Sequence, residues 1–173
     1  MLDDFIHQFR HYRSIGERAL AQLPDHALDH VPAPDANSAA MIVRHMSGNL
    51  VSRFTDFLTT DGEKEWRARD DEFVERSYSR AEVEELWANG WGVLERTLGS
   101  LTDTDLARTV TIRGEPMSVH AALCRALAHA AYHVGQLVLL AREGTSASWR
   151  WISIPKAASS ADDAAPTGER GSL

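Results

Sequence analysis

The chain has 173 residues, 43% hydrophobic and 25% charged, with a formal net charge of -7, which predicts one soluble globular domain with a sizeable core. The acidic balance argues against binding to nucleic acid or to an anionic membrane surface, because both require a basic face. No apolar run suits a membrane span, the N-terminus lacks the cationic start of a signal peptide, and the single Cys124 excludes an intramolecular disulfide, so we expect a cytoplasmic protein.

The first two of four expected helices occupy residues 2–23 and 38–58, where apolar residues recur at helical spacing. In the second helix, His45 and Asn49 lie one turn apart at the edge of the apolar stripe. A single histidine in such a place is more often an ordinary boundary residue than a metal ligand. His45 therefore needs partners elsewhere in the chain before it indicates a site.

A stretch dense in charge, residues 59–78, separates the second and third helices and contains Trp66 and Phe73. One interpretation is a solvated loop whose aromatic residues anchor it to the helices. The other is a lid or a subunit contact, because about 20 residues is long for a connection in a compact domain. The sequence leaves the role of this stretch open.

The third helix is expected to begin at a capping box, Ser79 to Glu82, and to run to Leu98. Residues 109–119 then alternate in polarity and contain the turn pair Arg113-Gly114. This pattern predicts a small hairpin that leads into the fourth helix.

The fourth helix, residues 118–143, is apolar nearly all round, so we expect it to be buried among its neighbours, with Cys124 inside. One narrow sector of this helix is polar, and a buried polar group is costly unless it finds a partner. That sector contains Arg125, His129, His133 and Gln136.

Beyond the fourth helix, Trp149, Trp151, Ile152 and Ile154 are expected to hold an extended segment against the helices. The small and polar residues 157–173 predict a flexible C-terminal tail. The fold expected for residues 1–156 is therefore an all-α four-helix bundle, with long connections between helices 2 and 3 and between helices 3 and 4.

His129 and His133 stand four residues apart on one helix face, so their imidazoles can converge on one ion. The alternative is two histidines hydrogen-bonded within the core. His45 could supply a third nitrogen from a neighbouring helix. Three neutral imidazoles without a nearby cysteine suit Zn(II), Ni(II), Fe(II) or Mn(II) and leave a position for water or substrate.

Three further side chains, Arg125, Asn49 and Gln136, are candidates to orient these ligands or to hold an anionic group. For Arg125 the alternative is a buried ion pair with a carboxylate.

The placing of His45 ahead of a distant H-A-A-Y-H-V-G-Q at 129–136 resembles the DinB/YfiT-like superfamily of four-helix-bundle metalloproteins, and within it an uncharacterised bacterial subfamily. The resemblance covers about residues 1–156. The stretches that carry it are SAAMIVRHMSGNLVSRF (38–54), DFLTTDGEKEWRARDDEF (56–73) and WISIPK (151–156).

This resemblance implies a divalent metal site made by His45, His129 and His133, with Zn or Ni favoured, in a homodimer. Better-known relatives use such a metal to activate a low-molecular-weight thiol, such as bacillithiol or mycothiol, for S-transfer or isomerisation. Others are described only as metal-dependent hydrolases.

Three functions follow as hypotheses: a metal-dependent thiol S-transferase acting on a small molecule, a hydrolase that uses metal-bound water, and a non-catalytic metal-binding or stress-related dimeric bundle. Hydrolysis requires a general base near the ion. No Glu or Asp stands within a turn of His129 or His133, which favours thiol transfer.

Overall fold

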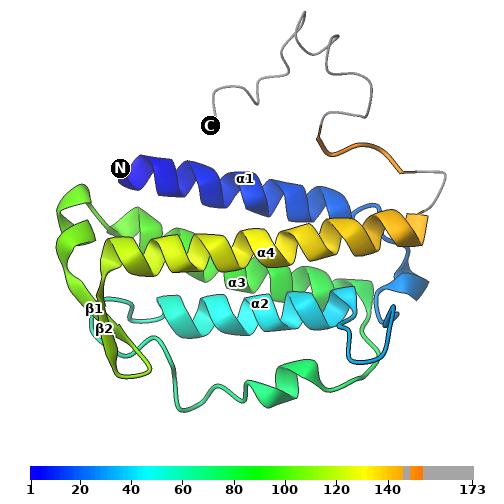
Figure 1. Cartoon of the computed structure of the whole chain (residues 1–173), viewed down its shortest axis with the longest axis horizontal. Helices are drawn as coiled ribbons and strands as arrows, with labels where there is room; N and C mark the ends of the chain where they lie inside the picture. Colours follow the sequence, from blue (N-terminus) through cyan, green and yellow to red (C-terminus); the bar gives the residue numbers. More distant parts are fainter. Residues whose placement is uncertain (146–148, 154–173) are drawn as a thin grey trace, which may run out of the picture.

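The computed structural model describes residues 1–145 and 149–153, a mostly helical chain with a small antiparallel hairpin, as the sequence predicts (Figure 1). The predicted tail, 157–173, and Ile154 lie outside the described residues. The helices are α1 (Leu2–Leu20), α2 (Ala39–Phe54), α3 (Arg80–Ser100) and α4 (Val119–Thr145), and the strands are β1 (Thr109–Ile112) and β2 (Glu115–Ser118). Three short 3-10 turns are η1 (Asp25–Ala27), η2 (Asp70–Phe73) and η3 (Asp103–Ala107).

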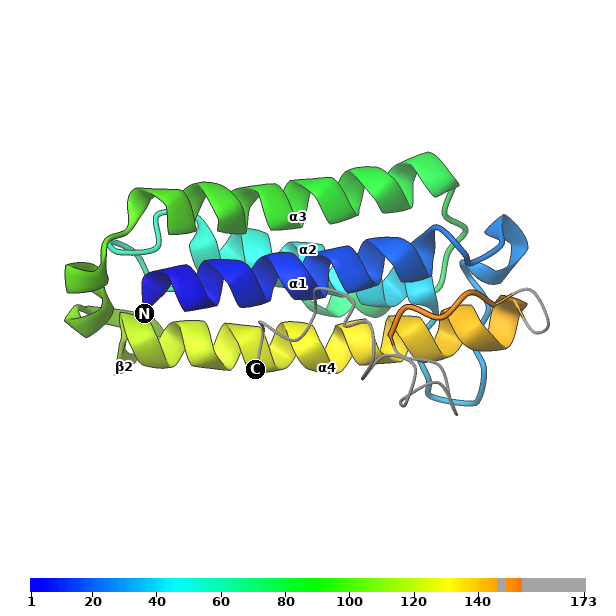
Figure 2. The ribbon, with the colours of Figure 1, turned by 90° about the horizontal axis from the view of Figure 1, so that it is seen from above.

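The four helices form a ring in which α1 lies diagonally opposite α2, and α3 lies opposite α4 (Figures 1 and 2). Helices α1 and α4 run in one direction and α2 and α3 in the other. Residues 55–79 therefore have to travel the length of the bundle between α2 and α3, and their η2 turn contacts α2. This is the long crossover of a bundle with two parallel neighbours.

The starts of α2, α3 and α4 follow from the capping residues that the sequence offers. Ser38 accepts a hydrogen bond from the N–H of Met41, and Ser118 accepts one from the N–H of Ala121. Ser79 and Glu82 form the predicted capping box at the start of α3. Each bond satisfies a backbone donor that the first turn of a helix leaves without an intrahelical partner.

The hairpin turn is fixed to the beginning of the crossover by Asp61. Arg113 and Gly114 have positive φ angles of 58° and 78°, which suits a two-residue hairpin loop. The Asp61 carboxylate accepts the N–H groups of both turn residues at 2.8 Å. Backbone N–H bonds from Glu63 and Gly114 lower the pKa of Asp61 to about 2, so the carboxylate stays ionised.

One close helix approach positions α2 against α3. A Cβ at Gly90 would lie 2.7 Å from the Cα of Ser47, a distance that only glycine permits. The core beside this contact is apolar, and its largest fully buried side chains include Trp91, Phe9, Ile42, Met46, Leu94, Leu123 and Leu137. Burying each contributes roughly 1.5–3 kcal/mol to folding.

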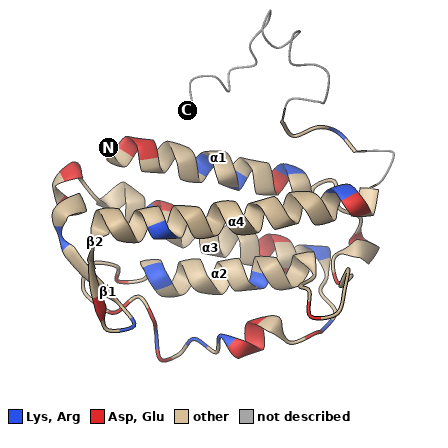
Figure 3. Ribbon diagram, in the orientation of Figure 1, with Lys and Arg blue, Asp and Glu red and all other residues tan. Residues whose placement is uncertain are grey.

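Helix α4 is not buried on all sides, and this part of the sequence prediction is wrong. Tyr132 is 63% exposed and Leu139 58% exposed, and Cys124 lies at the surface. In a ring of four helices each helix keeps one side toward solvent. That side of α4 carries apolar and small residues in place of charges, and its charged residues lie only at Arg125 and near its C-terminal end (Figure 3).

The aromatic residues of the charged stretch behave differently from one another. Trp66 is 60% exposed, so it does not anchor the stretch, whereas the ring of Phe73 lies 4.8 Å from the ring of His45. After α4, Ile152 is buried and Trp149 packs against the core as predicted, but Trp151 stays exposed. No described helix is both long enough and apolar enough to cross a membrane.

Candidate metal centre

The structure brings the three predicted histidines together between α2 and α4. One ring nitrogen from each of His45, His129 and His133 lies within 4.8 Å of the other two. The Nε2 atoms of His45 and His129 are 3.1 Å apart. His45 and His133 are buried and His129 is half-buried.

Hydrogen bonds outside the cluster fix which nitrogen of each buried ring carries the proton. The Nδ1 of His45 lies 2.8 Å from Oε2 of Glu72, and a carboxylate only accepts, so Nδ1 donates. The Nδ1 of His133 likewise donates to Oε1 of Gln136 at 2.8 Å, while the amide of Gln136 donates to the Tyr132 hydroxyl. In a ring whose Nδ1 donates in this way, a neutral Nε2 carries the lone pair and can bind a cation or accept a hydrogen bond, an arrangement typical of metal-binding histidines.

Glu72 is the part of the site that sequence reasoning missed. It comes from η2 in the crossover, and Arg67 donates to both of its oxygens, at 2.8 and 2.9 Å. Burial would raise the pKa of Glu72, but the hydrogen bonds from His45 and Arg67 outweigh burial and lower it. The one sequence signal was the unusual length of the charged stretch, since nothing in the local spacing connects residue 72 with residue 45.

Gly48 makes room for this carboxylate. A Cβ at Gly48 would lie 2.2 Å from Oε1 of Glu72 and 2.9 Å from its Cδ. The missing side chain one turn from His45 therefore lets the crossover press its carboxylate against α2.

The histidines of α4 are held in the protonation state that metals require. Burial, followed by the nearby His133 and His45, lowers the pKa of His129 to about 3. Burial also lowers the pKa of His133, although its bond to Gln136 opposes this effect. Both rings are neutral at pH 7, so no proton has to leave them before they bind a cation.

The donor set fits a divalent transition metal. Two nitrogens bound at about 2.1 Å to a tetrahedral ion are about 3.4 Å apart, close to the 3.1 Å between His45 and His129. Two ring nitrogens this close require either a shared proton or a cation, so hydrogen-bonded core histidines remain the alternative. Imidazole donors without thiolate or carboxylate suit Zn(II) and Ni(II) better than the oxygen-preferring Mn(II).

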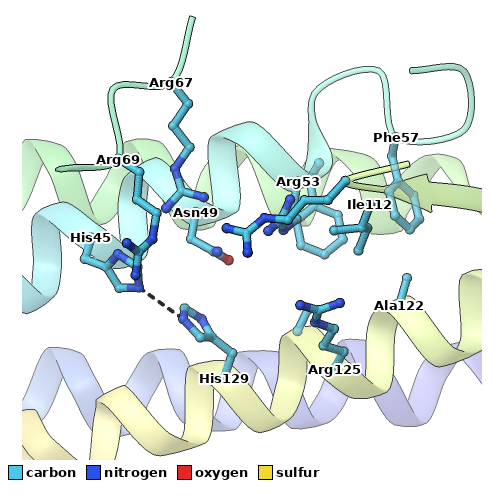
Figure 4. Close-up of a pocket in the computed structure, with 13 residues that line it drawn as sticks. His45, Asn49, Arg53, Phe57, Arg67, Arg69, Ile112, Ala122, Arg125 and His129 are labelled. Atoms are coloured by element: carbon cyan, nitrogen blue, oxygen red, sulfur yellow. Dashed lines mark hydrogen bonds between the residues drawn. The ribbon is translucent and has the colours of Figure 1, made fainter. Parts of the chain in front are cut away.

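A cavity of about 170 Å³ opens beside the histidines (Figure 4). His45 and His129 form one end of it, and two of the predicted accessory residues, Asn49 and Arg125, line it. The third, Gln136, lies instead against His133. Arg125 is exposed and forms no ion pair within the described residues, so the buried ion pair considered for it is wrong. The cavity also has an apolar wall made by Phe54, Phe57, Ile112, Ala122 and Ala126.

Fold and site together define a helical-bundle protein with a three-histidine cluster that could hold a metal ion. The chain belongs to the family described as Protein of unknown function (DUF1572), whose model matches residues 1–158. No curated protein matches the chain.

Proposed function

We propose that the protein is a DinB/YfiT-like metalloprotein that binds one divalent ion, Zn or Ni, through His45, His129 and His133. The observation that carries this proposal is the orientation of the rings. Glu72 and Gln136 each accept a hydrogen bond from the Nδ1–H of a buried histidine, which directs its Nε2 lone pair toward the ion.

We further propose that the site activates a low-molecular-weight thiol for transfer to a small molecule. A bound divalent ion would lower the pKa of a thiol and so supply a thiolate at neutral pH. The chain's own contribution would be to hold the thiol and its acceptor in the adjoining cavity. Asn49 and Arg125 are placed to orient them there.

Hydrolysis, the second candidate, is less well supported because it needs a base to accept a proton from water. The described residues that line the cavity include no carboxylate. Glu72, the acidic residue closest to the histidines, is ionised but already accepts bonds from His45 and Arg67 through both oxygens. A non-catalytic metal-binding bundle is the third candidate.

The proposal includes a homodimer formed through α4. Tyr132 and Leu139 are exposed and stand seven residues apart, which places them on the same helix face. Between them lies the exposed Gly135, and one turn before Tyr132 lies the exposed Ala128. Exposed apolar residues joined by small ones are typical of a surface that a partner covers.

Metal analysis tests the site. Protein purified without an affinity tag and dialysed against trace zinc or nickel should retain about one ion per chain, measured by plasma mass spectrometry. His129→Ala should lose this ion and keep its helical circular dichroism, whereas the exposed His7→Ala is a matched control that should keep it. A His129→Ala protein with full occupancy would overturn the assignment.

Thermal unfolding then tests the chemistry. A thiol that binds at the metal should raise the melting temperature of the metal-loaded protein more than that of the metal-free protein. Stabilisation by metal with no response to any thiol would favour the non-catalytic bundle.

A further inference from the structure

Arg53 on α2 is a buried cation with an unused donor. Its residue is 9% exposed, and its Nη2 lies 3.1 Å from Oε2 of Glu63. Its Nη1 is buried and has no hydrogen-bond partner among the described residues. Leaving a charged donor without a partner is costly, and such a group in a cavity wall indicates a ligand that completes it.

The electrostatic surroundings of Arg53 add to this indication. Glu63, its carboxylate partner, also pairs with Arg113 at 2.9 Å and lies 3.8 Å from Arg67. Burial lowers the pKa of Arg53; Glu63 opposes this shift, and the charges of Arg67 and Arg113 add to it. The guanidinium of Arg53 remains positively charged, and the shared carboxylate of Glu63 neutralises it only in part.

The cavity as a whole carries surplus positive charge. Five arginines line it, at positions 53, 67, 69, 113 and 125. Three carboxylates pair with them, those of Glu63, Glu72 and Asp70. Arg125 has no such partner among residues 1–145 and 149–153, and it stands on α4, across the cavity from Arg53 and one turn from His129 (Figure 4).

We infer that Arg53 and Arg125 bind the carboxylate of a small molecule whose other end reaches the metal centre at His45 and His129. A guanidinium matches a carboxylate in shape, and two of them on opposite walls can grip it from both sides. The apolar wall of Phe54, Phe57 and Ile112 suits a short hydrocarbon chain between the two ends. A singly charged carboxylate is also less costly to remove from water beside this wall than a doubly charged phosphate.

The size of the cavity limits the ligand. A water molecule takes up about 30 Å³ in the liquid, so 170 Å³ corresponds to roughly six water molecules. This inference rests on the proposed function for the metal-bound end of the ligand. If the protein is a thiol S-transferase, the substrate class is either a thiol that carries a carboxylate (a mercapto acid) or a carboxylic acid that accepts the sulfur of the thiol.

Paired ligands test the inference. Omega-mercapto carboxylates of two to six carbons would be titrated into zinc-loaded protein by calorimetry, each beside the mercapto alcohol of the same length. The carboxylates should bind roughly tenfold to a hundredfold more tightly at the best length, the usual range for a charge-assisted hydrogen bond. Equal affinities at every length would overturn the inference.

Variants separate the arginines from a direct carboxylate–zinc bond. Arg125→Gln should remove most of the carboxylate advantage and leave alcohol binding unchanged, whereas Arg96→Gln, an exposed control on α3 outside the cavity, should change neither. Arg53→Lys keeps the positive charge but loses the forked pair of N–H donors, so it should also weaken the binding of the mercapto carboxylates. An unchanged carboxylate affinity in Arg125→Gln would refute the assignment, whether or not Arg53→Lys folds.

Metal-free protein distinguishes this inference from the proposed function. Hexanoate should bind the metal-free protein more tightly than hexanol in an NMR titration, and Arg125→Gln should abolish the difference. If the protein retains no metal but hexanoate still binds through Arg125, the metal proposal fails and the anion site stands. If metal is retained but neither the mercapto carboxylates nor hexanoate bind more tightly than the matching alcohols, the anion site is refuted and the metal proposal stands.

Discussion

Gly48→Ala is predicted to weaken the metal centre without touching a ligand. The new Cβ would start 2.2 Å from Oε1 of Glu72, and an ordinary contact requires about 3.4 Å. The carboxylate therefore has to move by about 1 Å. That shift takes its 2.8 Å bonds to His45 and Arg67 beyond hydrogen-bond reach. Losing the partner that orients a metal-bound histidine costs roughly 10- to 100-fold in metal affinity, or about 1.4–2.7 kcal/mol.

Competition with a chromophoric zinc chelator would measure this loss. Gly99→Ala is the matched control, because a Cβ there meets nothing within 4 Å. Alanine in place of glycine in a helix should stabilise the control by up to about 1 kcal/mol without changing its metal affinity. Glu72→Gln should reproduce the weakening without the steric clash. If Gly48→Ala binds zinc as tightly as the unaltered protein, Glu72 does not support the site as argued.

Three other predictions concern stability and assembly. Metal-free protein should lose stability to urea as pH falls from about 6.5 toward 3, since unfolded histidine binds a proton in that range while folded His129 has a pKa of about 3. For this one group, the free energy of unfolding falls by at most about 1.4 kcal/mol per pH unit. If His129→Ala leaves this pH dependence unchanged, His129 is not its cause. Leu139→Glu should convert a dimer into a monomer in light scattering; unaltered protein that is itself monomeric would refute the α4 interface. Ser79→Ala should lower the free energy of unfolding by about 1 kcal/mol through loss of the cap, and an unchanged urea midpoint would count against that role.

The parts of the site that sequence analysis found are those fixed by helical spacing. His129 and His133 share a face because they stand four residues apart, and Gln136 reaches His133 from one turn further along the helix. The meeting of His45 with this pair was a hypothesis supported by resemblance. No spacing rule relates α2 to α4, which are joined through a crossover, a third helix and a hairpin.

The burial of α4 shows where sequence patterns mislead. Its alanines made the helix look apolar on all sides, but a small side chain is tolerated in a core and at a surface alike. Exposure of Tyr132, Leu139 and Cys124 was decided by where α1 and α2 pack against the helix. Trp66 was misplaced for a related reason, because the crossover is held by its charges and by Phe73.

The sequence by itself determined the helices, the N-caps of α2, α3 and α4, the hairpin and the histidine pair, because each depends on contacts within a few residues along the chain. Only the tertiary structure decided that Glu72 supports His45 and that Arg53 faces a cavity with an unpaired donor. Both depend on the path of residues 55–79 along α2, and the support of His45 by Glu72 depends also on the space left by Gly48. Such distances are set by the packing of elements that are far apart in sequence, which no local pattern records.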